Sequence, residues 1–150
     1  MIVIAEENEL PLAKRFYPNE EVKVIGVGIN AIKVLSQLPK NEKLHNVGYV
    51  GGWNIPIGTI VSVNKSRAYH PNVNYKDETY LLDAREELMN VPCYTSLDFV
   101  TANLVDTNPC VFDMELALIC AMGFEVDSIK VVSDNLNYKQ FKKKSLCLRK

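Results

Sequence analysis

Two acidic segments of the sequence contain residues that could serve a reaction depending on carboxyl groups. Glu115 closes the segment VFDME at residues 111–115, and Ser133 and Asp134 follow the apolar segment at residues 129–132. A carboxylate can accept hydrogen bonds from both hydroxyls of a vicinal diol, and a buried aspartic acid can stay protonated and donate a proton. Taken alone, each segment is also typical of ordinary helix capping, which favours acidic residues and Ser-Asp-Asn at a helix start.

A third segment, residues 46–52 (NVGYVGG), places glycines at the end of a predicted strand. Glycines in that position let the backbone approach a ligand closely. In isolation, a tight turn is the more common explanation of such a cluster. The β-branched stretch at residues 57–63 follows and predicts another strand.

The elements that must position these segments alternate between strands and helices. We expect strands at residues 2–5, 21–27, 44–50, 57–63, 93–95, 99–103 and 129–132, and helices at 8–17, 29–38, 80–89, 112–122 and 135–146. This alternation predicts an α/β fold over residues 1–150 as a single domain, with three α/β/α layers around a central mixed, largely parallel sheet. Ligands bind at the carboxyl ends of strands in such sheets, which is where Asp134 falls.

Composition and charge exclude several classes of function. The 150 residues carry a formal net charge of -1, so the chain has no overall attraction for nucleic acids, and we expect its one basic run, residues 142–144, to face solvent at a helix end. No stretch approaches the roughly 20 apolar residues of a membrane helix, and no secretory signal is evident, so we expect a cytoplasmic protein without membrane association. The four cysteines are Cys93, Cys110, Cys120 and Cys147. No two of them are closely spaced, which predicts reduced thiols and no zinc site.

Taken together and in this order, NVGYVGG, IGTIV, FDMELALICAMG and IKVVSDN resemble the nucleoside phosphorylase and nucleosidase superfamily, of the purine nucleoside and uridine phosphorylase type. The branch that looks most similar is the methylthioadenosine/S-adenosylhomocysteine nucleosidases, in a shortened form. The resemblance implies a phosphorylase/hydrolase-like fold and hydrolysis of the N-glycosidic bond of a purine nucleoside or thionucleoside. It implies no metal and no organic cofactor.

On the sugar side of the site, the resemblance assigns roles to four residues. Glu115 looks like the carboxylate that accepts hydrogen bonds from the ribose 2′- and 3′-hydroxyls, and Met114 like the residue that packs under the ribose ring. The glycine segment, including Tyr49 and Gly51, corresponds to the wall on the ribose side.

On the base side, the resemblance makes Asp134 the acid that serves purine N7, with Ser133 beside it. Phe99 aligns with the aromatic residue that stacks on the base, and Val100 with the neighbour whose backbone meets the purine edge. Glu9 falls where the water-activating glutamate belongs. A raised pKa at Asp134 would let it protonate the departing base, while Glu9 takes a proton from the attacking water.

The nucleophile decides between hydrolysis and phosphorolysis. Phosphorylases of this superfamily have an arginine just before the glycine segment and a serine or threonine inside it, where this chain has Asn46 and Tyr49. No arginine lies near those positions, which favours water. Three alternatives remain: a nucleoside-binding homologue without turnover, a phosphate-dependent phosphorylase, and a structural α/β domain without nucleoside affinity, against which the coincidence of motifs argues.

The resemblance also implies pairing of two chains, so we expect a homodimer. Superfamily sites often take residues from a neighbouring subunit near the sugar 5′ end, and His70 follows a predicted strand at a suitable place. An exposed loop histidine without function is the alternative for His70.

Overall fold

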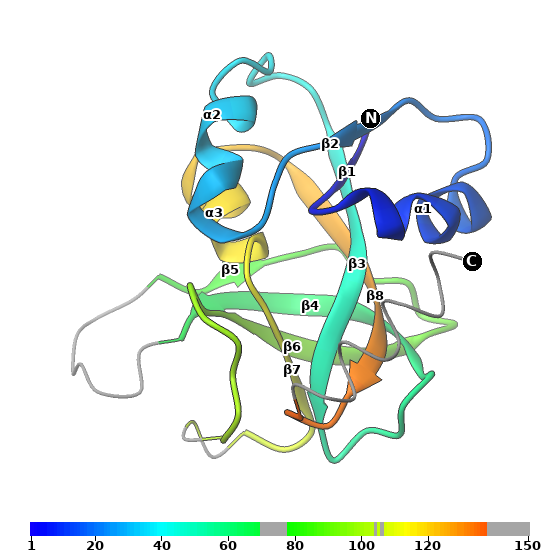
Figure 1. Cartoon of the computed structure of the whole chain (residues 1–150), viewed down its shortest axis with the longest axis vertical. Coiled ribbons are helices and arrows are strands. Elements are labelled where there is room, and N and C mark those ends of the chain that lie inside the picture. The colour runs from blue at the N-terminus through cyan, green and yellow to red at the C-terminus, as the bar shows by residue number, and fades with distance from the viewer. Residues whose placement is uncertain (70–77, 104, 106, 138–150) are drawn as a thin grey trace.

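The structure is a computed structural model, and it describes residues 1–69, 78–103, 105 and 107–137. In chain order its elements are β1 (Ile2–Ile4), η1 (Glu7–Glu9), α1 (Leu10–Phe16), β2 (Val22–Val24), η2 (Gly28–Asn30), α2 (Ala31–Leu35), β3 (Leu44–Trp53), β4 (Ile60–Ala68), β5 (Tyr80–Leu81), β6 (Met89–Thr95), β7 (Cys110–Asp113), α3 (Leu116–Ala121) and β8 (Val126–Asp134). Figure 1 shows these elements gathered around the long strands β3 and β8.

The strands form one mixed sheet, as the sequence predicted. Its order is β2-β1-β3-β7-β6-β4-β5, and β8 pairs with both β3 and β4. In the described part of the chain, five of the eight strand pairs are parallel and three are antiparallel. Because β8 joins β3 to β4, the strands β3, β7, β6, β4 and β8 pair in a closed circuit.

Helices cover both faces of the sheet around β1 and β3. Val3 packs in one apolar cluster with α2 and α3, whereas its neighbours Ile2 and Ile4 pack with α1. Such alternation follows from the two-residue period of a strand. In Figure 1, α2 and α3 accordingly lie on one side of β3 and α1 on the other. Of the helices that the structure describes, none is long and apolar enough to cross a membrane.

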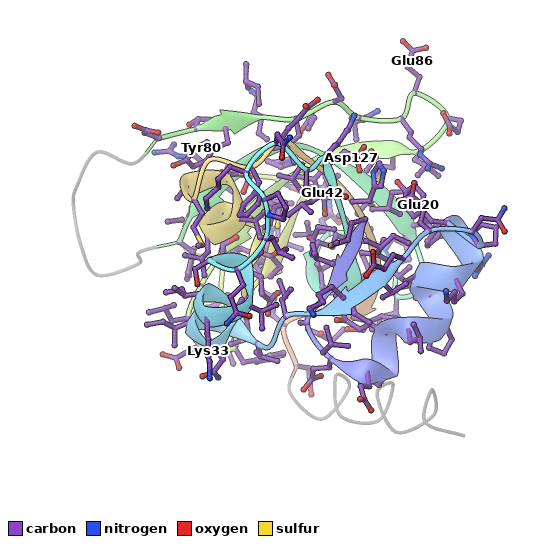
Figure 2. The ribbon with its side chains drawn as sticks, turned by 90° about the horizontal axis from the view of Figure 1, so that it is seen from above. Glu20, Lys33, Glu42, Tyr80, Glu86 and Asp127 are labelled. Carbon is purple, nitrogen blue, oxygen red and sulfur yellow. The ribbon has the colours of Figure 1, made fainter. Side chains whose placement is uncertain are left out.

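A charged cluster surrounds the amino ends of β1 and β3, on the outer surface. The amino group of Met1 lies 3.0 Å from Glu20 Oε2 and 3.7 Å from Glu42 Oε1. His45 Nδ1 lies 2.7 Å from Asp127 Oδ1, which joins β3 to the start of β8. Figure 2 shows Glu20, Glu42 and Asp127 on this face. The carboxyl ends of the same strands point away from this cluster.

Three predicted elements are corrected by the structure. The helix expected at residues 112–122 is shorter, because Cys110–Asp113 is a buried strand paired with β3 and β6. Residues 80–89 form no helix, because Tyr80–Leu81 pairs with β4 and Met89 opens β6. Residues 99–103 are not a strand.

The final predicted helix, residues 135–146, is not tested over most of its length. Residues 135–137 are not helical, and the remainder lies outside the described residues, as does His70.

Long-range pairing also extends the strands at the glycine segment. β3 continues through Gly51 and Gly52 to Trp53. Its parallel pairing with β8 shifts register between Val50 and Gly51. The shift places Gly51 directly opposite Asp134. The irregularity therefore brings the glycine segment against the predicted acid.

Candidate functional site

A cavity of about 260 Å³ opens where the carboxyl ends of β1, β6, β7 and β8 meet the glycine segment of β3. It brings together eight of the nine residues that the sequence predicted for the site: Glu9, Tyr49, Gly51, Phe99, Met114, Glu115, Ser133 and Asp134. The ninth, Val100, is buried in an apolar cluster with Tyr69, Cys110, Phe112 and Leu136 and is not part of the cavity wall. Residues distant in the sequence thus converge on one pocket.

Glu9 is held by three backbone amides. Its Oε1 accepts hydrogen bonds from the N–H groups of Ala5 (2.9 Å) and Glu6 (3.2 Å), and its Oε2 accepts one from Tyr49 N–H (2.8 Å). Burial raises the pKa of Glu9, although these donors act in the opposite direction by favouring the charged form. The carboxylate therefore has one fixed orientation and a strengthened affinity for a proton.

Glu115 lies at the start of α3 and is 6% exposed. Its Oε1 accepts a hydrogen bond from Gly28 N–H at 3.1 Å. Burial, followed by the negative charge of Asp113, raises the pKa of Glu115 to about 8, while the charge of Lys130 and the Gly28 amide work against this shift. The ionised form of Glu115 is therefore costly in this buried position and needs donors to stabilise it.

Behind Glu115 lies a buried ion pair that the sequence analysis missed. Lys130 Nζ is 3.2 Å from Asp113 Oδ2, and both side chains are almost fully buried. The Thr95 hydroxyl donates to Asp113 Oδ1. Lysine inside the otherwise apolar strand segment 129–132 was the available signal, because buried charges are usually paired.

Asp134 is fully buried beside the glycine segment. Its Oδ1 accepts a hydrogen bond from Leu136 N–H at 2.9 Å, and its Oδ2 accepts one from the Ser133 hydroxyl at 3.0 Å. Burial raises the pKa of Asp134 above its ordinary value, against the effect of these donors. A Cβ at Gly51 would lie 3.0 Å from Asp134 Oδ1, so glycine keeps that position clear.

The charged residues of the cavity wall are all acidic: Glu6, Glu9, Asp98, Asp113, Glu115 and Asp134. Within the described residues, no lysine, arginine or histidine lines the cavity, and no group of three or more His, Cys, Asp and Glu side chains could hold a metal ion. A cavity of this charge favours neutral or cationic ligands over anions.

Apolar and aromatic surfaces complete the wall. Phe99 offers a ring on which a flat base could stack, and Met114 supplies a flexible apolar contact. Tyr49 is half-buried, with its ring against the cluster that α1 forms with β1 and β3. Burial, together with the charge of Glu9, raises the pKa of the Tyr49 phenol, so it stays a neutral hydroxyl.

No protein-family model matches the sequence. No curated protein matches it either. Solved structures do match: the chain has the fold of 5′-methylthioadenosine nucleosidases, which confirms the fold that the sequence resemblance implied.

Three of these structures illustrate the similarity. A variant of MTAN from Chlamydia trachomatis bound to MTA has a TM-score of 0.76 and 17% identity, covering 98% of this chain and 89% of that one. The 5′-methylthioadenosine nucleosidase of Arabidopsis thaliana in apo form has a TM-score of 0.76 and 15% identity, with 98% and 88% covered. A putative 5′-methylthioadenosine/S-adenosylhomocysteine nucleosidase from Francisella philomiragia has a TM-score of 0.74 and 15% identity, with 98% and 92% covered.

Proposed function

We propose that the cavity is the active site of a hydrolase that cleaves the N-glycosidic bond of purine nucleosides or thionucleosides. The observation that carries this proposal is the convergence of three buried carboxyl groups, Glu9, Glu115 and Asp134, on one cavity beside an aromatic ring. One similar structure of C. trachomatis MTAN is bound to MTA, a thionucleoside of the proposed substrate class, and another is bound to adenine, a base that such a reaction would release.

Binding of the sugar falls to Glu115. When ionised, its carboxylate accepts hydrogen bonds from both ribose hydroxyls, and such charge-assisted bonds compensate for the buried charge. Met114 packs against the sugar ring, and Phe99 stacks on the base.

Departure of the base falls to Asp134. Its raised pKa keeps a larger fraction of the group protonated near neutral pH, so that it can give its proton to purine N7. The C1′–N9 bond then breaks, with its electron pair going to the base. The positive charge that develops on the sugar lies in a cavity whose charged side chains are all acidic, which stabilises it.

Addition of water falls to Glu9. Water forms the new bond to C1′ and gives up one proton, which the Glu9 carboxylate accepts. The three backbone amides hold Glu9 in place for this transfer. A phosphate dianion has no cationic partner among the described lining residues, so the wall favours hydrolysis over phosphorolysis.

We also propose that two chains pair beside the cavity and that the protein works in the cytoplasm. Ile29 and Leu97 are 62% and 65% exposed, and the carbonyl oxygen of Leu97 lies 3.8 Å from the Cβ position of Gly28, next to Ile29. Exposed apolar side chains on two neighbouring segments favour burial against a partner. Cys93, Cys110 and Cys120 are free thiols, which suits a reducing compartment.

The proposal is tested by measuring free base released from methylthioadenosine, S-adenosylhomocysteine, adenosine and inosine. We expect release by the wild type, a loss of about 10²–10⁴-fold in Asp134→Asn and a similar loss in Glu9→Gln, because each removes a general acid or base. Asp83→Asn is the matched control, since Asp83 is exposed and outside the cavity wall. Nucleoside binding without release would mean that this chain is the non-catalytic homologue.

A further inference from the structure

Glu115 occupies the N-cap position of α3 without acting as its cap. The residue has φ −134° and ψ −29°, and its side chain makes no capping hydrogen bond. A residue in this position ordinarily uses its own side chain to accept from the first amides of the helix. Here the carboxylate instead lines the cavity and accepts from Gly28 N–H.

Thr95 and Asp113 perform the capping in place of Glu115. Leu116 N–H donates to Asp113 Oδ2 at 2.9 Å, and Ala117 N–H donates to the Thr95 hydroxyl oxygen at 2.9 Å. These are the first two amides of the helix, which have no partner within it. Because both are satisfied by other side chains, Glu115 is left available for the cavity.

The arrangement depends on the register of two neighbouring strands. Thr95 at the end of β6 pairs with Asp113 at the end of β7, so their side chains lie on the same face. The Thr95 hydroxyl oxygen accepts a hydrogen bond from the Ala117 amide, and the hydroxyl donates its own hydrogen to Asp113 Oδ1. Lys130 neutralises the Asp113 charge from behind. Every one of these side chains is buried.

We propose that Thr95 is a positioning residue for Glu115 and thereby sets a preference for ribonucleosides over 2′-deoxyribonucleosides. The proposal rests on the proposed function, in which Glu115 binds the sugar diol. Thr95 touches no substrate in this account; it acts through the first turn of α3.

If the Thr95 hydroxyl is removed, the Ala117 amide competes with the Gly28 amide for the Glu115 carboxylate. In Thr95→Val the Ala117 amide loses its acceptor in a buried place, where an unpaired donor is costly. The Glu115 carboxylate belongs to the N-cap residue of the same helix, and an N-cap side chain can accept from that amide. When the carboxylate turns toward α3, it moves away from the Gly28 amide and from the position of the sugar diol.

The test compares the dissociation constants of adenosine and 2′-deoxyadenosine by calorimetry, with every protein also carrying Asp134→Asn so that hydrolysis is suppressed during the titration. With threonine at residue 95 we expect adenosine to bind at least about tenfold more tightly, because a hydrogen bond to a charged acceptor is lost with the 2′-hydroxyl. Thr95→Val should reduce this ratio at least about fivefold, and Thr95→Ser, which keeps the hydroxyl, should restore it. Thr59→Val is the matched control, because the Thr59 hydroxyl donates to Pro56 outside the cavity.

A purely structural role would lower the melting temperature or weaken both ligands equally, and it would leave the ratio unchanged. An unchanged ratio in Thr95→Val, with nucleosides still bound, would overturn the positioning role and leave the proposed function standing.

A second readout needs no ligand. The Gly28 amide, followed by ¹⁵N NMR, should exchange with solvent faster in Thr95→Val than in Thr95→Ser, because its bond to Glu115 is released. If the wild type binds no nucleoside, the proposed function fails, and this amide alone decides whether Thr95 positions Glu115. Equal exchange in the two variants would refute the positioning role.

Discussion

Gly48 leaves the space that the Glu9 carboxylate occupies: a Cβ at Gly48 would lie 2.5 Å from Glu9 Oε2. The carboxylate is fixed on its other sides by the amides of Ala5, Glu6 and Tyr49. A methyl group at residue 48 therefore cannot be accommodated without moving the proposed base. The glycine segment thus leaves room for the Glu9 carboxylate and also lines the cavity.

Substitution of Gly48 by alanine should consequently impair catalysis more than folding. Displacement of the Glu9 carboxylate by about 1 Å is expected to lower base release about 100-fold, since small misplacements of reacting groups cost that much. Rates of base release and the melting temperature of Gly48→Ala would be measured together. Full activity in a folded Gly48→Ala protein would show that the position of Glu9 is unimportant.

Nucleoside binding should strengthen as the pH rises toward 8. The pKa of Glu115 is raised to about 8, and only its ionised form accepts from both sugar hydroxyls. Well below that pH, the affinity for adenosine should increase about tenfold per pH unit, because binding competes with the proton. Calorimetric titrations of Asp134→Asn, in which hydrolysis is suppressed, would show this slope over several pH values, and adding Glu115→Gln should abolish it. A slope that persists in Glu115→Gln would assign the titration to another group.

The same carboxyl group should make the protein less stable as the pH rises from about 4.5 to about 8. The folded-state pKa of Glu115 lies near 8 and its unfolded value near 4.5, so the folded state holds a proton that the unfolded state releases. This contribution is present below about pH 4.5 and is lost as the pH rises to about 8. Its magnitude is of order a few kcal/mol.

In Glu115→Gln this pH dependence of the folding stability should be absent. The melting temperature of the wild type relative to Glu115→Gln should therefore fall between pH 5 and 8. A difference that stays constant over this range would contradict the burial of an uncharged Glu115.

Loss of one partner of the Lys130–Asp113 ion pair should destabilise the fold. Lys130→Met leaves a buried carboxylate without its cation, and such a change costs about 3–5 kcal/mol. Urea denaturation would measure the free energy of unfolding. The double variant Lys130→Met/Asp113→Asn should recover part of the loss because no unpaired charge remains. Equal stabilities of the wild type and Lys130→Met would show that the pair contributes nothing.

Much of the site could be predicted from the sequence because its residues sit in short, characteristic segments. Asp134 ends an apolar strand segment, and Glu115 opens a helical one, so both could be located without knowledge of the fold. The strand-end rule placed Asp134 at a ligand site, and the family resemblance brought Glu115 to the same site.

The remaining features depend on pairing between distant segments. The sequence predicted residues 112 and 113 as the start of a helix, whereas pairing with β3 and β6 makes residues 110–113 a strand. Thr95 carries no signal by itself, because its role arises only when the register of β6 and β7 places it beside Asp113. Val100 follows Phe99 directly, yet it packs into the apolar cluster rather than the cavity.

Hydrolysis at the cavity is tested by identifying the sugar product formed from methylthioadenosine when inorganic phosphate is present in excess. Mass spectrometry would separate the free methylthioribose from its 1-phosphate, while chromatography quantifies adenine. We predict that adenine and the free sugar form in equal amounts, and that phosphate does not change the rate of their release. Formation of the sugar 1-phosphate, or absence of adenine from a protein that is folded, would contradict it.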